Sequence, residues 1–485
     1  MTLRPSFLIA TALLAASCCG GTASRRAASC PGELETSAKA TTVQTVSGPV
    51  AGYIDDGVYI YKGIPYAKAE RFQEPQDPEP WKEVRSSRAY GPTCPQDKRA
   101  GWYDDHQAFA MHWDDGFPDE DCLRVNIWTA GINDGGKRPV MVWLHGGGFR
   151  AGSGQELISY DGSNMARDHG VVIVTLNHRL NVLGFLDLSA YGAKYAHTGN
   201  LGMLDIVKAL QWVRDNIDNF GGDPSNVTIF GQSGGGGKVC TLMAMPSAKG
   251  LFSKAIVESG SITDLMSPQV SRKIGTYTVE ALGVKPSRVD DLASAPYEAL
   301  LAAYNGAIRK ASQEAREDGT LPENILSMIL YGQVPVVDGD VIPFQPSTPD
   351  ALALSKDIPT IIGTTYNEFT PAQEDPIFKP LADAQASVRT EYGCAPVYKY
   401  LFTWETPVLD GVMKSPHCME IPFVFDNVML HRTYTGGGED AVQLGHRVSR
   451  LWSSFAKNGV PSAAEMPTWK PWPATLRINV QTTIE

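Results

Sequence analysis

Short apolar segments rich in β-branched residues recur through the middle of the chain, and each is followed by small or polar residues. They cover residues 140–144, 171–175, 227–230, 254–258 and 359–363. Such near-continuous apolar runs are typical of strands that are buried on both faces of a sheet. Leucine and valine residues recur three apart between the second and third runs, which predicts an amphipathic helix ending near Ile217. This alternation predicts an α/β protein with a mostly parallel, doubly wound sheet and helices on both faces.

Composition narrows the class of protein. The 485 residues include 42 Lys and Arg against 53 Asp and Glu, a net charge of −11, and 43 % of the residues are hydrophobic. A chain of this composition can bury a large core, so it is not mainly disordered or fibrous. The acidic balance argues against nucleic acid as a partner. Residues 40–485 contain no internal repeat or low-complexity linker, so we expect one domain where length alone suggests about three.

The N-terminus reads as a targeting segment. Arg4, an apolar run over residues 7–16 and small residues up to Ala23 have the layout of a secretory signal peptide over residues 1–23. The run is about half of the roughly 20 residues that cross a bilayer, so we expect no integral membrane span. Cys18 is an alternative lipoprotein acylation site, although the Leu expected three residues before it is missing. The sequence therefore predicts a secreted or periplasmic protein.

Export places the cysteines in an oxidising compartment, where pairing is chemically allowed. Cys94 and Cys122 bracket a loop rich in Asp and aromatic residues, and closing it would remove about 3 to 4 kcal/mol of denatured-state freedom. Cys240 lies in an apolar helical pattern and is expected to be buried and free. Cys394 and Cys418 are either a pair or two separate thiols, since sequence alone does not fix connectivity.

The chemistry of such sheets lies beyond the carboxyl ends of the strands. The strand over 227–230 is followed by Gly231-Gln-Ser-Gly-Gly-Gly-Gly237, and a helical pattern begins at Lys238. A G-x-S-x-G sequence between strand and helix is typical of a nucleophile elbow, whose glycines allow a tight turn that exposes the serine at a helix N-terminus. The alternative is a flexible Gly/Ser turn, which the strand before and the helix after argue against. Ser233 is therefore the candidate nucleophile.

The strand over 140–144 is followed by His145-Gly-Gly-Gly-Phe149. Consecutive glycines cost conformational entropy on folding, so we expect their backbone N–H groups to approach a reacting atom closely. An oxyanion hole requires such an approach. A phosphate-binding loop is the alternative, but the spacing fits neither G-x-G-x-x-G nor a P-loop.

Glu368 follows the strand over 359–363, and the remaining partner is a histidine. A hydrolase of this architecture places nucleophile, acid and histidine in that chain order, and His417, His431 and His446 lie downstream of Glu368. His446 falls off an apolar helical stripe and is expected on a solvated face, and His431 has no distinguishing context. His417 lies on a loop that contains Pro416, which is the better place for a general base.

These segments resemble the type-B carboxylesterase family of the α/β-hydrolase superfamily, which also contains the cholinesterases and the bacterial p-nitrobenzyl esterases. Residues 220–235 match the serine signature of that family throughout. Residues 120–128 match its second signature, with Ala130 where Pro is usual. Further matches at 61–67, 177–180 and 199–202 extend the resemblance over about residues 45–475.

The resemblance implies a serine carboxylesterase that hydrolyses small-molecule esters through an acyl-enzyme intermediate. The site residues that it implies are the triad Ser233, Glu368 and His417, the oxyanion donors Gly147, Gly148 and Gly234, and a disulfide between Cys94 and Cys122. No cofactor is implied, and no metal-binding spacing such as H-E-x-x-H appears in the sequence.

Three departures from the family pattern stand out. Gln232 precedes the nucleophile where the family often has Glu, and Lys238 stands where relatives often carry a small hydroxyl residue. Glu368 and His417 are separated by fewer residues than usual, which predicts either a wider mouth to the site or impaired folding. Two alternatives remain open: a lipase or polyester hydrolase of the same fold, and a non-catalytic binding module. The retained triad and triple glycine argue against the binding module.

Overall fold

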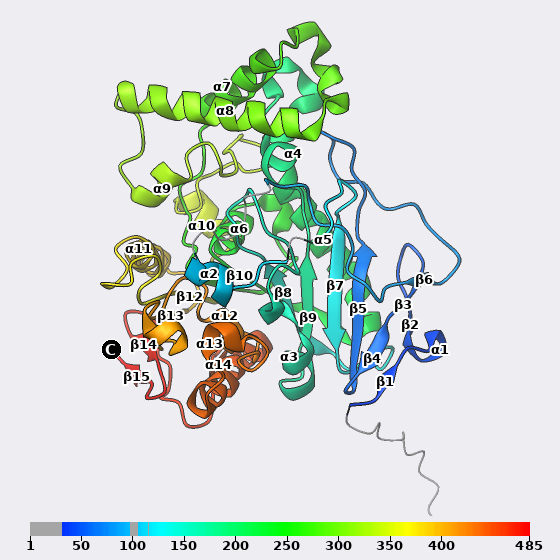
Figure 1. Cartoon of the computed structure of the whole chain (residues 1–485), viewed down its shortest axis with the longest axis vertical. Helices are drawn as coiled ribbons and strands as arrows, with labels where there is room; N and C mark the ends of the chain where they lie inside the picture. The colour runs from blue at the N-terminus through cyan, green and yellow to red at the C-terminus, as the bar shows by residue number, and fades with distance from the viewer. Residues whose placement is uncertain (1–31, 98–104, 115) are drawn as a thin grey trace, which may run out of the picture.

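The computed structural model describes residues 32–97, 105–114 and 116–485, and its main feature is a 12-stranded sheet (Figure 1). The strands of this sheet, in spatial order, are β1 (Leu34–Glu35), β4 (Tyr53–Asp55), β5 (Val58–Pro65), β7 (Arg124–Thr129), β9 (Val172–Leu176), β8 (Arg138–Leu144), β10 (Gly222–Gln232), β11 (Lys254–Glu258), β12 (Thr360–Thr365), β13 (Val397–Phe402), β14 (Thr475–Ile478) and β15 (Thr483–Ile484). A smaller 3-stranded sheet contains β2 (Thr42–Gln44), β3 (Pro49–Ala51) and β6 (Arg85–Ser86).

Helices connect the strands and cover the sheet. The α-helices are α1 (Ala38–Thr41), α2 (Asp105–Ala110), α3 (Ser163–Asp168), α4 (Asn181–Phe185), α5 (Leu201–Asn216), α6 (Gly234–Met243), α7 (Pro268–Ala281), α8 (Tyr297–Glu317), α9 (Ile325–Ile329), α10 (Pro349–Leu354), α11 (Phe378–Glu391), α12 (Ile421–Val424), α13 (Arg432–Thr435) and α14 (Glu439–Asn458). Within the described residues, no helix is long and apolar enough to cross a membrane.

The predicted strands are confirmed as β8, β9, β10, β11 and β12. From β9 to β14 every neighbouring pair runs parallel, whereas the pairs at the two edges of the sheet are antiparallel. The amphipathic helix predicted to end near Ile217 is α5, which ends at Asn216. The predicted α/β class with a mostly parallel sheet is therefore confirmed.

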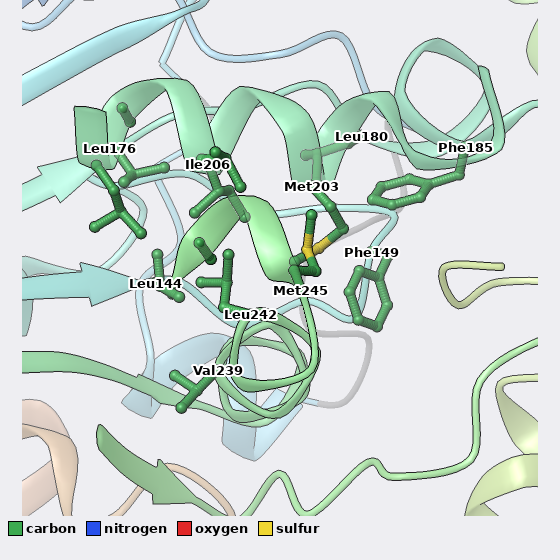
Figure 2. Close-up of a cluster of buried hydrophobic side chains, with 14 of the residues drawn as sticks. Leu144, Phe149, Leu176, Leu180, Phe185, Met203, Ile206, Val239, Leu242 and Met245 are labelled. Atoms are coloured by element: carbon green, nitrogen blue, oxygen red, sulfur yellow. The ribbon is translucent and has the colours of Figure 1, made fainter. Parts of the chain in front are cut away.

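Burial on both faces explains why the strands read as apolar runs. In β8, Val142 and Leu144 face one apolar cluster while Met141 and Trp143 face another. Helices α5 and α6 pack on the first side, where Leu144 lies among residues of both helices (Figure 2). Helices α3, α12 and α14 contribute to the cluster on the second side. A parallel sheet covered in this way places the carboxyl ends of β8, β10, β11 and β12 at one edge.

The structure does not contain the predicted disulfide between Cys94 and Cys122. Cys94 and Cys122 are buried side by side as free thiols, and a hydrogen bond with Cys94 together with burial raises the pKa of the Cys122 thiol. The sulfur of Cys94 instead accepts a hydrogen bond from the backbone N–H of Leu180 at 3.2 Å. The two residues are neighbours as predicted, but the covalent bond is absent from the structure.

The remaining cysteine predictions divide in two. Cys240 is buried and free as expected, and Cys394 and Cys418 are two separate thiols. The predicted signal peptide over residues 1–23 and the alternative acylation site at Cys18 lie outside the described residues. Both stay predictions.

Candidate active site

Ser233 lies on the sharp turn between β10 and α6. Its φ of 57° and ψ of −124° fall in a region that residues with a side chain rarely adopt. The turn is held by its backbone N–H, which donates to the carbonyl of Glu258 at 2.8 Å. Ser233 is partly exposed, whereas Gln232 and Gly234 on either side are buried. The elbow therefore presents one hydroxyl to the outside of an otherwise buried turn.

The glycines around the elbow allow three backbone segments to touch. A Cβ atom at Gly234 would lie 2.3 Å from the carbonyl oxygen of Gly148, so these two residues pack backbone against backbone. Gly147 and Gly148 have positive φ angles of 76° and 66°, which glycine adopts without strain. A Cβ atom at Gly146 would lie 3.5 Å from the Cβ atom of Ser233. The structure thus brings the predicted oxyanion donors next to Ser233, the predicted nucleophile.

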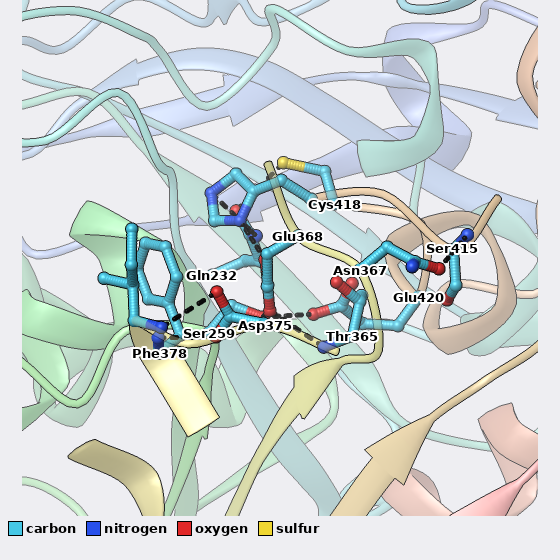
Figure 3. A network of polar contacts seen from close by, with 12 residues as sticks. Gln232, Ser259, Thr365, Asn367, Glu368, Asp375, Phe378, Ser415, Cys418 and Glu420 are labelled. Atoms are coloured by element: carbon cyan, nitrogen blue, oxygen red, sulfur yellow. Dashed lines mark hydrogen bonds and ion pairs between the residues drawn. The ribbon is translucent and has the colours of Figure 1, made fainter. Parts of the chain in front are cut away.

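Glu368 and His417 are both buried and interact directly through Oε2 of the carboxylate and Nδ1 of the imidazole. The second carboxylate oxygen accepts hydrogen bonds from the hydroxyl of Ser259 at 2.6 Å and from the backbone N–H of Thr365 at 2.8 Å (Figure 3). The backbone N–H of His417 donates to the carbonyl of Glu368 at 3.0 Å. These contacts orient the carboxylate and require that His417 carries a proton on Nδ1, which leaves Nε2 as the basic atom.

The Nε2 atom of His417 faces the residue before the nucleophile. The side-chain amide of Gln232 donates to it at 3.2 Å, and the thiol of Cys418 donates to the amide oxygen of Gln232 at 3.1 Å. Among the hydrogen bonds of the described residues, none joins this nitrogen to the hydroxyl of Ser233. The rings of Phe369 and Phe378 pack on the imidazole with centroids 4.4 Å and 5.2 Å away. In free enzymes the bond between nucleophile and base is often unmade and forms only with substrate.

Sequence reasoning missed Ser259. The end of β11 carries Glu258-Ser-Gly-Ser261, and a Cβ atom at Gly260 would lie 2.2 Å from the carbonyl oxygen of Ser233. Ser259 also has a positive φ of 44°, another sign of a constrained turn. The sequence did contain a sign of it, because this polar segment directly follows a buried strand. It therefore lies at the same edge of the sheet as the segments that contain the glycine loop, Ser233 and Glu368.

Two further carboxyl groups are buried behind the triad acid. Burial raises the pKa of Glu258 to about 8, and burial together with the charge of Glu258 raises that of Glu420. Glu258 accepts a hydrogen bond from the indole N–H of Trp452 at 2.6 Å. These two groups therefore favour their neutral forms. Glu368, by contrast, has polar partners at both of its carboxylate oxygens.

The other two candidate histidines lie outside the site. His431 is buried, donates from Nε2 to the carbonyl of Ala110 at 3.0 Å and accepts from the hydroxyl of Ser159 at 2.6 Å. Burial lowers the pKa of His431 to about 4. The side chain of His446 is 54 % exposed and contacts Asp426, on the solvated face that the helical pattern predicts.

A cavity of about 370 Å³ is lined in part by the segment that follows β11. Ser261 and Ile262, which follow the glycine that touches Ser233, form part of its wall, and the remaining walls include Met266, Leu326 and Leu330. A larger groove of about 1240 Å³ lies away from these residues and is lined by ion-paired side chains such as Arg71 with Glu120. The smaller cavity is joined to the elbow through Ser261, which follows the Gly260 that contacts the backbone of Ser233.

Among the described residues, no group of three or more His, Cys, Asp or Glu side chains is arranged to hold a metal ion. The arrangement instead contains what acyl transfer needs. It has an exposed hydroxyl, a histidine oriented by a carboxylate, and a glycine loop packed against the nucleophile.

Comparison with known proteins agrees with this arrangement. A family model described as the carboxylesterase family matches residues 39–377 and 377–483. The para-nitrobenzyl esterase of Bacillus subtilis (strain 168) is 36 % identical, over 91 % of this chain and 96 % of the relative. The medium-chain fatty acyl-CoA hydrolase precursor of Anas platyrhynchos is 33 % identical, over 88 % of this chain and 86 % of the relative.

Solved structures give the same result. An esterase from Clostridium hathewayi, described as able to hydrolyse aliphatic aromatic polyesters, has a TM-score of 0.81 at 33 % identity, covering 92 % of this chain and 95 % of that chain. A structure of a PNB esterase has a TM-score of 0.77 at 33 % identity, covering 92 % of this chain and 97 % of that chain. The chain therefore belongs to the carboxylesterase family and is an enzyme of the α/β-hydrolase fold that acts on carboxylic ester bonds.

Proposed function

We propose that this enzyme is a secreted serine carboxylesterase with Ser233 as nucleophile, His417 as general base and Glu368 as the acid of the triad. The observation that carries the proposal is the contact between Glu368 and Nδ1 of His417, made beside the strained elbow of Ser233. A carboxylate fixed by Ser259 and Thr365 orients the imidazole and stabilises its cation during the reaction.

The reaction proceeds through an acyl-enzyme. His417 takes the proton of Ser233 as Oγ attacks the ester carbonyl, and then gives it to the leaving alcohol. Backbone N–H groups of Gly147, Gly148 and Gly234 hold the negative oxygen of the tetrahedral intermediate, each worth about 3 to 4 kcal/mol of transition-state stabilisation. Water activated by the same histidine then releases the acid.

The substrate is an ester with an apolar group of modest size. The 370 Å³ cavity that Ser261 helps to line has mainly apolar walls, with side chains such as Ile262, Met266 and Leu330, which favour an alkyl or aryl group over a charged one. Gln232 is neutral, so the position directly before Ser233 adds no carboxylate that would help to bind a cationic ester. We therefore place neutral esters ahead of choline esters.

Hydrolysis of a polyester is the second candidate function. The Clostridium hathewayi relative supports it, and so does Phe369, whose ring packs on His417 while the residue stays 49 % exposed. An exposed aromatic ring beside the base offers a surface on which a polymer segment can lie. The short segment between Glu368 and His417, with its predicted wider mouth, fits the same substrate.

A panel of p-nitrophenyl esters from acetate to palmitate, assayed with the purified enzyme and with Ser233→Ala, tests the proposal. We expect turnover to fall about a millionfold in the variant, as for other triad nucleophiles. A fluorophosphonate probe should label the wild type and not the variant, while both unfold at similar temperatures. Equal hydrolysis by both proteins would exclude Ser233 as nucleophile.

The same panel separates the two candidate functions. A short-chain esterase prefers acetate and butyrate and shows no activation above the solubility limit of the substrate. Release of soluble acids from an aliphatic aromatic polyester film, absent with Ser233→Ala, would establish the second candidate.

Location and domain organisation are proposals as well. Residues 1–23 provide the export signal, and residues 40–485 form one α/β-hydrolase domain, a reading supported by the strand pairings that run from β4 to β15 through one sheet. Intact mass of the mature protein from culture medium and from cells tests the export signal. A lipid-modified N-terminus at Cys18 would instead establish the lipoprotein alternative.

A further inference from the structure

Lys238 is a buried lysine in the second turn of the helix that follows Ser233. We propose that it is a positioning residue, whose amino group holds the glycine loop in the orientation that the oxyanion donors require. The inference rests on the proposed function, because it assigns a role within the same reaction.

The surroundings of Lys238 show one specific polar contact. The side chain is fully buried in α6, and Nζ donates to the carbonyl oxygen of His145 at 2.8 Å, while the ring of Phe149 lies 5.9 Å away. Burial lowers the pKa of Lys238, an effect opposed by the carboxylate of Glu156. Burying an amine costs free energy that a serine or a methionine at this position would avoid. That cost points to a role for the contact with His145.

Glu156 completes the electrostatic environment of the lysine. Its carboxylate accepts from the backbone N–H of Ser153 at 2.6 Å and from the hydroxyl of Tyr160 at 3.0 Å. The imidazole of His145 stacks on that of His178 with centroids 5.0 Å apart, and burial with the charge of Lys238 lowers the pKa of both rings. Lys238 therefore faces neutral imidazoles and one carboxyl group, and its strongest contact is the loop carbonyl.

The loop is fixed one peptide unit at a time. The carbonyl of His145 accepts from Lys238, the carbonyl of Gly146 accepts from Nδ1 of the neutral His145 ring at 3.0 Å, and the carbonyl of Gly147 accepts from the N–H of Ala151 at 3.1 Å. A peptide unit is planar and its C=O and N–H point in opposite directions. Holding each carbonyl therefore aims the next N–H, in turn that of Gly146, Gly147 and Gly148, away from the holding group. The contact of Lys238 fixes the first of these units, from which the peptide units of the donors Gly147 and Gly148 continue.

Lys238 differs from the other two holding groups in its origin. His145 and Ala151 belong to the segment that contains the loop, so they keep its shape but do not place it. Lys238 belongs to α6, the helix whose first residue follows Ser233. Its bond to His145 therefore ties the loop to the nucleophile across 93 residues of sequence. Without this hydrogen bond, the position of the glycine N–H groups relative to the oxyanion is less restricted.

Lys238→Met tests the proposal, with Lys399→Met as its matched control. Lys399 is also a buried lysine, 1 % exposed on β13 and paired with Asp383 at 3.1 Å, so its loss imposes a comparable structural change far from the loop. We expect Lys238→Met to lower kcat by about 100-fold, the scale of a misplacement of about 1 Å, with little change in KM. Lys399→Met is expected to lower the melting temperature without changing kcat.

A transition-state analogue separates positioning from folding. An alkyl trifluoromethyl ketone, which forms a tetrahedral adduct with the serine, should bind Lys238→Met more weakly by the same factor as kcat falls. The corresponding secondary alcohol, which forms no oxyanion, should bind Lys238→Met with the same affinity as the wild type. Lys238→Arg, which keeps a charged donor, should recover part of the loss in both kcat and ketone affinity.

The outcomes are distinct. Wild-type kcat and ketone affinity in Lys238→Met would overturn the proposal, as would equal losses in the Lys399→Met control. If Lys238→Met does not fold, Lys238→Gln takes its place with the same expected pattern and the same criteria. The proposed function fails by a different result. It would be refuted if Ser233→Ala hydrolysed esters as fast as the wild type, whatever the activity of Lys238→Met.

Discussion

Glu368 is a buried carboxyl group on which several hydrogen-bond donors converge. Its Oε2 faces His417, and its Oε1 accepts from Ser259 at 2.6 Å and from Thr365 at 2.8 Å. The hydroxyl of Ser259 also lies 3.4 Å from Oε1 of Glu420, whose pKa is raised by burial. Ser259 thus lies between two buried carboxyl groups, and its single hydroxyl proton is donated to Glu368 at the shorter distance.

At the residue scale, we expect Ser259→Ala to lower kcat/KM by about 10- to 100-fold. Removing the hydroxyl deletes a hydrogen bond to a charged group, worth about 1.5 to 3 kcal/mol. Steady-state kinetics with p-nitrophenyl butyrate measure the change. Ser449→Ala is the control, because Ser449 is a buried serine of α14 whose hydroxyl has no partner in the structure. Equal activities of the two variants would show that Ser259 does not support the triad.

Helix α6 is an unusual element because it begins with four glycines. Glycine within a helix costs about 0.5 to 1 kcal/mol relative to alanine, so propensity alone disfavours a helix there. Close packing on β8 explains the composition, since a Cβ atom at Gly235 would lie 1.9 Å from the carbonyl oxygen of Leu144. The missing side chains let the helix N-terminus approach the strand end that begins the glycine loop.

At the element scale, we expect Gly235→Ala to destabilise the enzyme by about 3 kcal/mol or more, since the clash forces the helix away from β8. Gly306→Ala is the opposite case. Gly306 lies in α8, and a Cβ atom there would meet only the end of Arg309 at 3.7 Å. That substitution should stabilise the enzyme by about 0.5 to 1 kcal/mol. Urea unfolding curves measure both, and a stabilising Gly235→Ala would contradict the packing described for α6.

On the scale of the whole molecule, His431 joins three segments that are far apart in the sequence. It bonds to Ala110 at the end of α2 and to Ser159 in the short 3₁₀ helix Ile158–Tyr160, while α13 follows it directly. Burial lowers its pKa to about 4 from an ordinary value of 6.5. A neutral imidazole is therefore part of how these segments hold together.

We expect this histidine to make the fold less stable in acid. Between pH 6.5 and about 4, His431 is protonated in the unfolded chain but neutral in the folded protein. Its contribution to the free energy of unfolding is therefore complete above pH 6.5 and is lost as the pH falls toward 4. The loss is about 3 kcal/mol, on the scale of 1.36 kcal/mol for each pKa unit. His431→Gln should flatten the plot of unfolding free energy against pH in this window.

Thr433→Ala provides the comparison for that measurement. Thr433 donates to the same carbonyl of Ala110 at 3.0 Å but carries no group that titrates. Its loss should lower stability by a similar amount at every pH, leaving the slope of the wild type. If His431→Gln keeps the wild-type slope, the acid sensitivity comes from other groups.

The sequence by itself determined those features that depend on neighbouring residues. Apolar runs located the parallel strands to within a few residues. The succession of strand, glycine turn and helix likewise located the elbow of Ser233. Both patterns consist of residues that are adjacent in the sequence, so they can be recognised without the tertiary structure. The predicted Glu368 and His417 lie in contact for a related reason, since the chain order of the triad follows from the order of strands. In the cysteines, proximity of Cys94 and Cys122 was predicted correctly and the covalent bond was not.

Only the tertiary structure decided contacts between segments whose distance is set by the register of the sheet. Ser259 reaches Glu368 across 109 residues because β11 and β12 pair in parallel and end together. Lys238 reaches the carbonyl of His145 because Gly235 lets α6 pack directly against the end of β8. A lysine and a serine taken singly carry no such information, since their roles come from the partner that the fold places at hydrogen-bond distance.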